Sequence, residues 1–336
     1  MTSASLPSLG VSLGLWQDRP SDEVLVTALA ADRLGFNDLW IGEMATYDAF
    51  ALGAVIAERT HRVPLTLGPF AVAVRDPVMI AMGVASVAEL TGRRVNVAIG
   101  SSSPLVVEQW HGRVQHRPAL ALREMSTALR VLLAGEKLNL EGDVLRSQGY
   151  RLRAAPPRSE LTIAAFGSGA INVAATMADR MVVNLVTPQL AGRLAAAMRD
   201  DAFRAERRAP RVAAWVTAAV DPGDDAFEQL RRGIVGYLSA PGYGEMFREA
   251  GFGDIVAFAR QGPHPKQLLA AIPDDLVRSV SLIGSLGEVR GGLARYAEAG
   301  VDEVIVVPSS VSSDPGGVHT LELLAGLSEP PGADAP

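Results

Sequence analysis

The chain has 336 residues, of which 48% are hydrophobic and 20% charged, so it can bury a large core and a disordered chain is excluded. Its 31 Lys and Arg against 37 Asp and Glu give a formal net charge of −6, which argues against a general binder of nucleic acid or acidic membranes. The absence of Cys excludes disulfides, thiolate metal sites and Cys nucleophiles.

Short apolar runs alternate with longer helical patterns along the chain, which is typical of βα units and a parallel sheet. Buried parallel strands are nearly continuous hydrophobic runs, because both of their faces are covered. Eight such runs are predicted as strands: Leu9–Leu15, Asp38–Gly42, Val63–Gly68, Val95–Ile99, Leu161–Ala165, Arg180–Val186, Arg211–Val220 and Asp302–Val307.

Helical patterns with recognisable ends lie between these strands. Ser21 is predicted to cap the first helix, which ends at Gly35. Proline in the first turn marks the start of two others. The later predicted helices are Pro77–Leu90, Pro118–Gly135, Gln189–Arg207, Ala226–Leu238 and Leu286–Ala299.

Three stretches interrupt the alternation. Residues 137–153 alternate polar and apolar side chains around Gly142, which predicts a small β excursion. Residues 239–275 are rich in Gly, Pro and Phe, and we expect short helices that cover a site like a lid. The tail, 328–336, is predicted to be disordered.

Eight strands with intervening helices favour an α/β fold of the (β/α)8 TIM barrel class, with insertions, over a doubly wound sheet. We expect one barrel domain over residues 1–327. No run reaches about 18 apolar residues, so no membrane span is predicted. Met1–Pro7 does not resemble a signal peptide, and we expect a cytoplasmic protein.

The ends of the second and third predicted strands carry candidate site residues, since barrel chemistry lies at strand carboxyl ends. Glu43 could hydrogen-bond the polar edge of a ligand, or it could be a salt-bridged or capping acid. Asp48 is better explained as a helix N-cap. Gly68-Pro69 inside an apolar run predicts a bulge, either as a ligand clamp or as an ordinary irregular loop.

Small residues follow the fourth and fifth predicted strands. Gly100 precedes three serines, Ser101 to Ser103, which suit a polyol or phosphate but also a helix N-cap. Ala165 and Phe166 lead into Gly167, Ser168 and Gly169, where bare backbone N–H groups at a helix start can bind an anion. The alternative is a tight turn that needs glycine for positive φ.

His111 follows Trp110 just beyond the fourth strand and could donate a proton or bind a ligand, although a lone histidine is more often structural. No spacing of His, Asp and Glu predicts a metal site. The sequence has no nucleophile elbow, Walker loop or dinucleotide-binding glycine motif.

Taken together, these motifs resemble the luciferase-like monooxygenase family, and within it the branch that uses the deazaflavin coenzyme F420. The resemblance spans roughly Leu9 to Pro308. It rests on the order and spacing of six stretches: Leu39–Glu43 with Asp48–Phe50, Arg75–Pro77, Thr91–Gly100, Ser101–Gly112, Gly167–Val182 and Gly284–Val307.

The resemblance implies a bacterial luciferase-like barrel with F420, or alternatively FMN, at the strand carboxyl ends. Phe70 and Ala71 would form a bulge with a cis non-prolyl peptide behind the cofactor ring. Gly100, Ser101 and Ser102 would lie near the ring and ribityl chain. Gly167, Ser168 and Gly169, preceded by Ala165 and Phe166, would bind the phosphate.

One position departs from the family pattern. Many relatives carry a His after the acid that ends strand two, and Met44 stands there in this chain. Because Met cannot transfer protons, His111 or Glu43 would have to supply one, unless the reaction needs only hydride transfer.

The implied activity is hydride transfer between F420 and a small organic substrate. The alternatives are an FMN-dependent monooxygenase, a cofactor-binding protein that has lost catalysis, and a barrel lyase or aldolase, for which a lysine at a strand end is missing. The expected partners are a small-molecule substrate and a second copy in a homodimer, with no nucleic acid and no membrane. Tyr237, Tyr243, Phe247, Phe252 and Phe258 either line the substrate pocket or pack the insertion.

Overall fold

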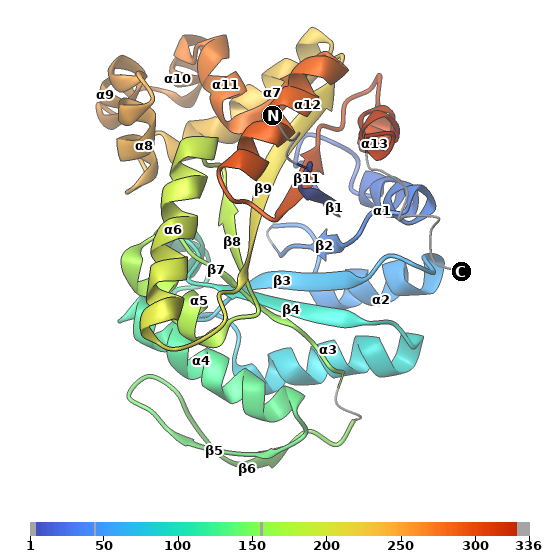
Figure 1. Cartoon of the computed structure of the whole chain (residues 1–336), viewed down its shortest axis with the longest axis vertical. Helices are drawn as coiled ribbons and strands as arrows, with labels where there is room; N and C mark the ends of the chain where they lie inside the picture. Colours follow the sequence, from blue (N-terminus) through green and yellow to red (C-terminus); the bar gives the residue numbers. More distant parts are fainter. Residues whose placement is uncertain (1–4, 44, 155–156, 328–336) are drawn as a thin grey trace. The chain divides into compact units, whose positions relative to one another are not determined.

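The computed structural model describes residues 5–43, 45–154 and 157–327, and strands alternate with helices along it (Figure 1). The strands are β1 (Ser8–Ser12), β2 (Leu39–Ile41), β3 (Leu65–Ala71), β4 (Val95–Gly100), β5 (Lys137–Glu141), β6 (Arg146–Arg151), β7 (Leu161–Ala164), β8 (Arg180–Asn184), β9 (Arg211–Val220), β10 (Ser281–Gly284) and β11 (Glu303–Pro308). All eight predicted strands are confirmed, and β10 is an additional one.

The helices also follow the predicted pattern. They are α1 (Glu23–Leu34), α2 (Ala49–Arg59), α3 (Pro77–Thr91), α4 (Pro118–Leu133), α5 (Ser168–Met177), α6 (Pro188–Arg204), α7 (Asp224–Ile234), α8 (Tyr243–Glu249), α9 (Gly253–Arg260), α10 (Pro265–Ala271), α11 (Asp274–Val280), α12 (Leu286–Glu298) and α13 (Val318–Ala325). A π-helix, Leu105–Trp110, and the 3₁₀ turns Val235–Tyr237 and Pro315–Gly317 complete them.

Local signals explain several helix ends. Asp76 caps α3 by accepting a hydrogen bond from the Met79 N–H, and Ser285 caps α12 in the same way. Gly35 ends α1 in the left-handed conformation, as predicted. The predicted cap at Ser21 is wrong: Asp22 precedes the helix, because the Glu23 N–H is already bound by the Pro20 carbonyl.

The described chain divides into two compact units. The first contains residues 5–36, 184–193 and 214–327, and β10, most of β9, β11 and β1 lie in it in the order β10-β9-β11-β1. The second contains Asn37–Val183 and Leu194–Ala213, and its strands are ordered β2-β3-β4-β7-β8. The pairs β2–β3, β3–β4, β4–β7 and β7–β8 are parallel, so these strands present their carboxyl ends at one edge.

A buried ion pair holds the amino ends of the strands in the second unit. Arg180, 2% exposed, donates to Asp38 (2.8 Å), Thr66 (3.0 Å) and Thr162 (3.1 Å), and its guanidinium lies over the Trp40 ring. A buried charge is tolerated only where it is paired and hydrogen-bonded. This cluster therefore joins β2, β3, β7 and β8 at the end opposite to the predicted site.

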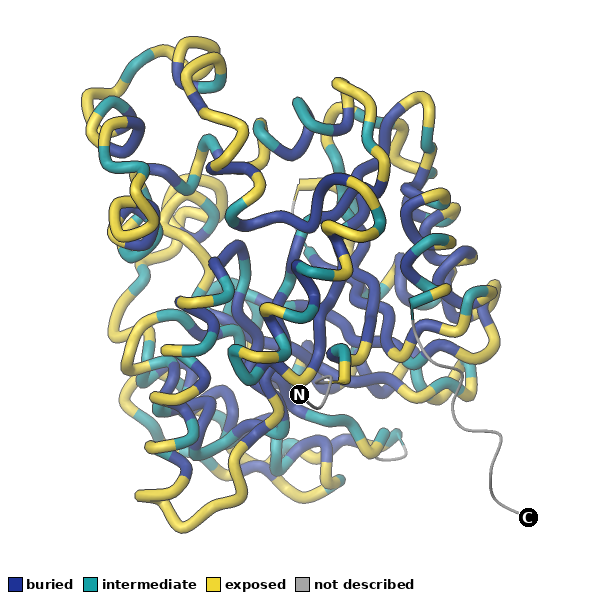
Figure 2. The backbone as a smooth tube through the Cα atoms, turned by 45° about the horizontal axis from the view of Figure 1, so that its top comes forward, coloured by how far each residue is buried: buried dark blue, intermediate teal, exposed yellow. Residues whose placement is uncertain are grey.

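The core consists largely of Ala, Val, Leu and Ile, as the low aromatic content of the sequence requires. Figure 2 shows buried backbone concentrated in the strands and exposed backbone in the loops and outer helix turns. Trp40, Phe70 and Phe247 are the aromatic side chains among the largest fully buried ones in the described chain.

The predicted local structure of the irregular stretches is confirmed where the structure describes them, whereas the covering of a site by residues 239–275 stays a prediction. Residues 137–153 contain the antiparallel pair β5–β6, which contacts α4 (Figure 1). Residues 239–275 contain short helices, α8 to α10 and the start of α11. The predicted disordered tail, 328–336, lies outside the described residues.

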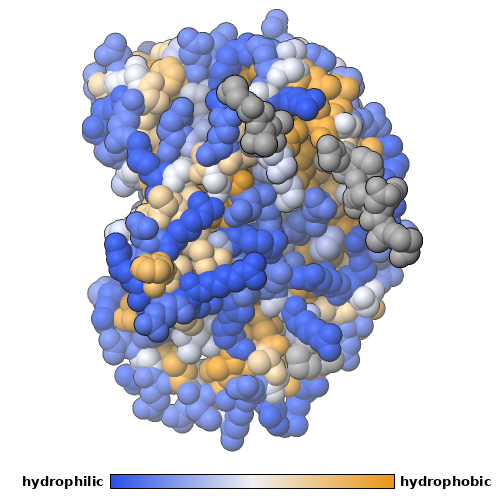
Figure 3. Space-filling view, viewed as in Figure 1, coloured by the Kyte–Doolittle hydropathy of each residue, from blue (hydrophilic) through white to orange (hydrophobic). Residues whose placement is uncertain are grey.

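The described part of the chain contains no helix that is long and apolar enough to cross a membrane. On the face shown in Figure 3, hydrophilic side chains predominate and apolar ones form separate patches.

Candidate functional site

All of the predicted site residues belong to the second unit. They lie in the last residues of β3 and β4 or after β2, β4 and β7, and the carboxyl ends of these strands meet at one edge of the sheet. Ala71 pairs with Gly100, and Gly100 pairs with Ala164, so three strand ends lie in adjacent register. Neighbouring strands are about 4.8 Å apart, so a planar ligand could contact several of them at once.

The predicted bulge in β3 is confirmed. The pairing with β4 shifts between Leu67 and Phe70, and Gly68 has φ +106°. A Cβ at Gly68 would lie 2.2 Å from the Ala98 carbonyl oxygen, so only glycine fits there. The cis peptide, however, joins Gly68 and Pro69, so the expected cis non-prolyl bond at Phe70–Ala71 is wrong; cis bonds occur mainly before proline.

The side chain of Phe70 does not face a ligand. It is 0% exposed and stacks on Phe50, with ring centroids 4.8 Å apart. Any contribution of Phe70 to binding therefore comes from its backbone, together with the half-buried Ala71.

Glu43 lies in a cluster of charged side chains. Arg75 donates to Glu43 Oε2 (2.8 Å) and Oε1 and also to Asp48, and its guanidinium lies over the Phe50 and Phe70 rings. The two carboxylates raise the pKa of Arg75. Of the two explanations for Glu43, the geometry shows the salt-bridged acid.

Asp48 is the predicted N-cap of α2, and this prediction is confirmed. Its carboxylate accepts hydrogen bonds from the Phe50 and Ala51 N–H groups. Burial opposes the charge, but the bonds from Ala51 and Arg75 hold the pKa of Asp48 below its usual value.

The loop after β4 is small and polar. A Cβ at Gly100 would lie 3.1 Å from the Ala164 Cβ and 3.7 Å from the Pro69 Cβ, so a larger residue would crowd this edge. Gln115 fixes the loop by donating to the carbonyls of Ser101 (2.8 Å) and Ser102 (3.2 Å). The Ser101 and Ser102 hydroxyls have no hydrogen-bond partner within the described chain, so they remain able to bind a ligand.

The turn from β7 into α5 is bare. Ala165 is buried and bonded to the Val182 carbonyl, whereas Gly167, Ser168 and Gly169 are exposed. No side chain caps α5, so the N–H groups of its first turn lack acceptors within the helix. Gly169 approaches α4 closely, since a Cβ there would lie 2.9 Å from the Ala119 Cβ.

Gly167 is the informative residue of this turn. Its φ is −80°, so the alternative that the turn needs glycine for positive φ is wrong. Nothing lies within 4 Å of the place where its Cβ would be. Neither the backbone nor the packing demands glycine, and what the missing side chain provides is open access to the N–H groups of α5. An oxyanion is the natural ligand for such donors.

His111 ends the π-helix after β4 and is exposed. Its imidazole has no hydrogen-bond partner within residues 5–43, 45–154 and 157–327. Met44, the departure from the family pattern, lies outside the described residues. The described part of the chain also contains no group of three His, Asp or Glu side chains that could hold a metal.

Two residues with a role at this edge were missed from the sequence: Arg75, which joins β3 to the acids after β2, and Gln115, which holds the β4 loop. A single cation placed after a strand, with two acids after the preceding strand, is a signal that could have found Arg75. Gln115 gave no such signal.

The aromatic residues of the insertion belong to the first unit. Tyr237 and Tyr243 contact each other edge to face, the Asn184 side chain donates to the Tyr237 hydroxyl, and Tyr243 donates to the Asn184 carbonyl. Burial raises the pKa of both tyrosines. Phe247 is fully buried, so for this residue the prediction that it packs the insertion is confirmed over the alternative that it lines a pocket.

Comparison with known proteins gives one family and one fold. Residues 7–303 match the sequence model of the luciferase-like monooxygenase family. A Mycobacterium tuberculosis protein that carries the name of a coenzyme F420-dependent oxidoreductase is 26% identical over 332 residues, covering 90% of this chain and 95% of that protein.

Solved structures share the fold over nearly the whole chain. The coenzyme F420-dependent tetrahydromethanopterin reductase of Methanopyrus kandleri has a TM-score of 0.81 at 19% identity, covering 96% of this chain and 98% of that one. An F420-dependent secondary alcohol dehydrogenase, solved with an F420–acetone adduct, has a TM-score of 0.79 at 18% identity, covering 96% and 100%. A type II Baeyer–Villiger monooxygenase from Pseudomonas putida, solved with FMN, has a TM-score of 0.71 at 19% identity, and the match covers 95% of this chain and 97% of that one.

The predicted (β/α)8 barrel with insertions is the fold that these proteins share, so the predicted fold class is confirmed. The match covers most of the chain, and it includes the carboxyl ends of β2, β3, β4 and β7. The chain belongs to the luciferase-like monooxygenase family.

Proposed function

We propose that the protein is an oxidoreductase that transfers a hydride between coenzyme F420 and a small organic substrate. The family, the F420-dependent relative and the F420-dependent structural neighbours support this proposal. The residues at the carboxyl ends of β3, β4 and β7 must then fit a flat ring and a phosphate.

The bare turn at Gly167 fits the phosphate and carries the proposal. The first turn of α5 offers N–H groups with no side-chain cap, and the open space at Gly167 leaves them accessible. Backbone donors at a helix N-terminus favour an anion through both hydrogen bonds and the helix dipole. Gly167, Ser168 and Gly169 would hold this group.

The small residues nearby fit the rest of the cofactor. Gly100, in register with Ala71 and Ala164, avoids crowding Ala164 and Pro69 at the sheet edge where the ring would lie. The unpartnered hydroxyls of Ser101 and Ser102 would bind the polar chain between ring and phosphate. The backbone of Phe70 and Ala71 would support one face of the ring, so that the substrate meets the other.

When bound, the deazaflavin supplies the hydride donor or acceptor, and the chemistry is its own. The protein binds, orients and excludes water. Alignment of two reactants within one site is itself a large part of the rate enhancement. The glycine, alanine and serine residues at the strand ends serve this alignment.

A proton at the substrate oxygen would come from one of two candidates. Glu43 is held by Arg75 and also accepts from the Ala49 N–H, so its oxygens are largely occupied. His111 is exposed and its imidazole nitrogens have no partner among the described residues. We therefore propose His111 as the proton donor and Glu43 as a positioning residue.

The same turn could bind the phosphate of FMN, and the fold shared with an FMN-containing monooxygenase favours this second candidate. With FMN, an oxygen-using monooxygenase would follow. A cofactor-binding protein without catalysis is a third possibility, and Met44 is the residue that suggests it.

Titration of the purified protein with F420 and with FMN, each followed by fluorescence, separates these candidates. We expect micromolar affinity for F420 and none for FMN. The reverse result would replace the proposal with the monooxygenase. Tight F420 binding without hydride exchange, across a broad panel of acceptors, would leave only the binding protein.

We further infer a homodimer in the cytoplasm, from the family resemblance and from the sequence. Analytical ultracentrifugation tests the dimer directly. A monomer at micromolar concentration would contradict it.

A further inference from the structure

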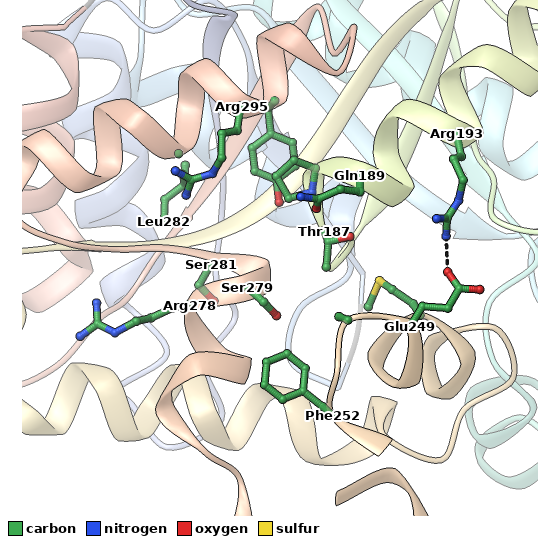
Figure 4. A pocket seen from close by; sticks show the side chains of 15 residues that line it. Thr187, Gln189, Arg193, Glu249, Phe252, Arg278, Ser279, Ser281, Leu282 and Arg295 are labelled. Carbon is green, nitrogen blue, oxygen red and sulfur yellow. Dashed lines mark hydrogen bonds and ion pairs between the residues drawn. The ribbon is translucent and has the colours of Figure 1, made fainter. Parts of the chain in front are cut away.

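A ligand-sized cavity in the first unit is not used by the proposed function. Its volume is about 480 Å³, within the range of small-molecule pockets. It lies among residues from α6, α8, α11, β10 and α12, all of them in the same unit (Figure 4). None of its lining residues is among those proposed to hold the deazaflavin.

The cavity has an apolar side. Its apolar lining includes Met246, Phe252 and Leu282, and the first and last of these are almost completely buried. The Tyr296 hydroxyl donates to the Val186 carbonyl at 2.7 Å, so this tyrosine offers its ring rather than a free donor. An apolar group of a ligand would be removed from water here.

Two of the three arginines at the cavity are already engaged. Arg193 is ion-paired with Glu249 at 2.5 Å, as the dashed line in Figure 4 shows. Arg278 donates to the Ile283 carbonyl at 3.2 Å and lies over the Phe227 ring. Neither guanidinium is fully available to a ligand.

The third arginine is different. Arg295, on the last turn of α12, has no ion pair or hydrogen bond from its side chain within the described chain, although it lines the cavity. Its nitrogens lie about one turn back along α12, 3.8 Å and 3.7 Å from where Cβ atoms of Gly291 and Gly292 would be. The Leu282 side chain fills the space at Gly292, with its Cδ2 atom 2.5 Å from that Cβ position, whereas at Gly291 no atom other than the Arg295 nitrogen lies within 4 Å. The guanidinium is therefore left uncovered on the Gly291 side.

The other available polar group at the cavity is an amide, whose NH2 group can donate. The Gln189 side chain, at the start of α6, has no partner among the described residues, and it lines the same cavity. Thr187 uses its hydroxyl oxygen to accept from the Leu190 N–H. The one carboxylate of the lining, Glu249, is paired with Arg193. Donors without acceptors are what an oxyanion would complete.

We propose that this cavity is a binding site in its own right for a small organic anion, a carboxylate on an apolar body. The guanidinium of Arg295 and the amide of Gln189 would bind the carboxylate, and Phe252 with its apolar neighbours would cover the rest. A guanidinium and a carboxylate match in planar, two-bond geometry.

Calorimetric titration with benzoate and with its neutral isostere benzamide tests this proposal, whichever cofactor the protein uses. Benzoate should bind at least about tenfold more tightly than benzamide, since a charge-assisted bond is lost in the amide. Equal affinities, or no benzoate binding up to about 10 mM, would overturn the proposal.

Matched variants identify the residues. Arg295→Gln should bring benzoate to the affinity of benzamide, whereas Arg290→Gln, on the same helix but outside the cavity lining, should change nothing. Phe252→Ala should weaken both ligands, and Phe258→Ala, on the same insertion, neither. Since Arg295 is exposed, the Arg295→Gln variant should fold. Arg295→Lys provides a second test, because lysine keeps the positive charge but lacks the two parallel N–H donors of the guanidinium.

Saturation with F420 completes the experiment. Unchanged benzoate affinity in the presence of F420 is expected for a site of its own. Loss of benzoate binding would mean that the cavity belongs to the cofactor site, and it would overturn the proposal.

Discussion

The carboxyl ends of β7 and β3 differ in how far their polar groups are already paired within the protein. After β7, Gly167 leaves the first turn of α5 without a cap and without side chains around it. After β3, Arg75 joins the carboxylates of Glu43 and Asp48 and covers two aromatic rings. One end offers unused donors, and the other has nearly all of its polar groups paired with each other.

We infer from this difference that the β7 end binds the ligand, whereas the β3 end stabilises the strand. Unused main-chain donors favour an incoming anion, because no internal partner must first be displaced. A completed ion cluster stabilises the strand end but has little left to offer a ligand. The comparison predicts that adding atoms harms the first end, whereas removing them harms the second.

The largest expected effect is from Gly167→Val. Its side chain would occupy the space in front of the α5 N–H groups and should weaken F420 binding by about 100-fold or more, the loss of several charge-assisted hydrogen bonds. The melting temperature should stay within about 2 °C, since nothing lies within 4 Å of the new Cβ. Fluorescence titration and calorimetry measure the two quantities.

Gly287→Val is the matched control, because Gly287 also sits in open space in a first helix turn, but in α12, which Ser285 caps. It should leave F420 affinity unchanged. By contrast, Gly169→Val should lose stability as well as binding, since its Cβ would press on Ala119. Normal F420 affinity in Gly167→Val would refute the phosphate assignment.

The next largest effect concerns the proton. His111→Gln should lower turnover by about 100-fold, the lower range for a lost general acid, and should remove an ionisation from the pH–rate profile. Glu43→Gln should act mainly on substrate or cofactor affinity, because Glu43 is held by Arg75. Steady-state kinetics over pH 5 to 9 distinguishes them. A larger turnover loss in Glu43→Gln would reverse the two roles.

Removing Arg75 tests the support provided by the charged end. Arg75→Met should destabilise the protein by about 1–3 kcal/mol, because the half-buried carboxylate of Glu43 and the exposed one of Asp48 both lose their charged donor. Arg33→Met breaks an exposed pair with Glu322 and should cost less than about 1 kcal/mol. Urea denaturation compares them, and equal losses would mean that the cluster gives no special support.

The smallest effect is a pH dependence at the same end. The pKa of Asp48 is lowered in the folded protein, so its contribution to stability is present above the unfolded value near about 3.9 and is lost as pH falls through the lower folded value. Asp48→Asn keeps an N-cap but should flatten stability between about pH 5 and 3. Identical acid unfolding of both proteins would contradict this origin.

Sequence alone predicted much of the barrel, because buried parallel strands are continuous apolar runs and helix ends carry Pro, Asp and Gly signals. It missed β10, Ser281–Gly284, since four buried residues directly after a helix do not stand out from that helix. It misplaced the cis peptide at Phe70–Ala71, where the choice depends on the local backbone at Gly68-Pro69.

The main-chain features of the candidate site and several of its side chains were predicted, whereas Arg75 and Gln115 were missed. The glycines at the ends of β7 and β4 could be recognised, because a glycine in the sequence directly shows that a side chain is absent. The partners of Arg75 depend on the packing of β2 against β3, and the cavity at Arg295 joins residues more than 100 positions apart. Such contacts are set by tertiary structure, which local patterns do not encode.

A crystal structure of the protein with F420 tests the central claim most directly. We predict that phosphate oxygens lie about 3 Å from N–H groups in the first turn of α5, beside Gly167, with the ring along the ends of β3 and β4. A phosphate bound elsewhere, or side chains that fill the space in front of Gly167, would contradict the claim.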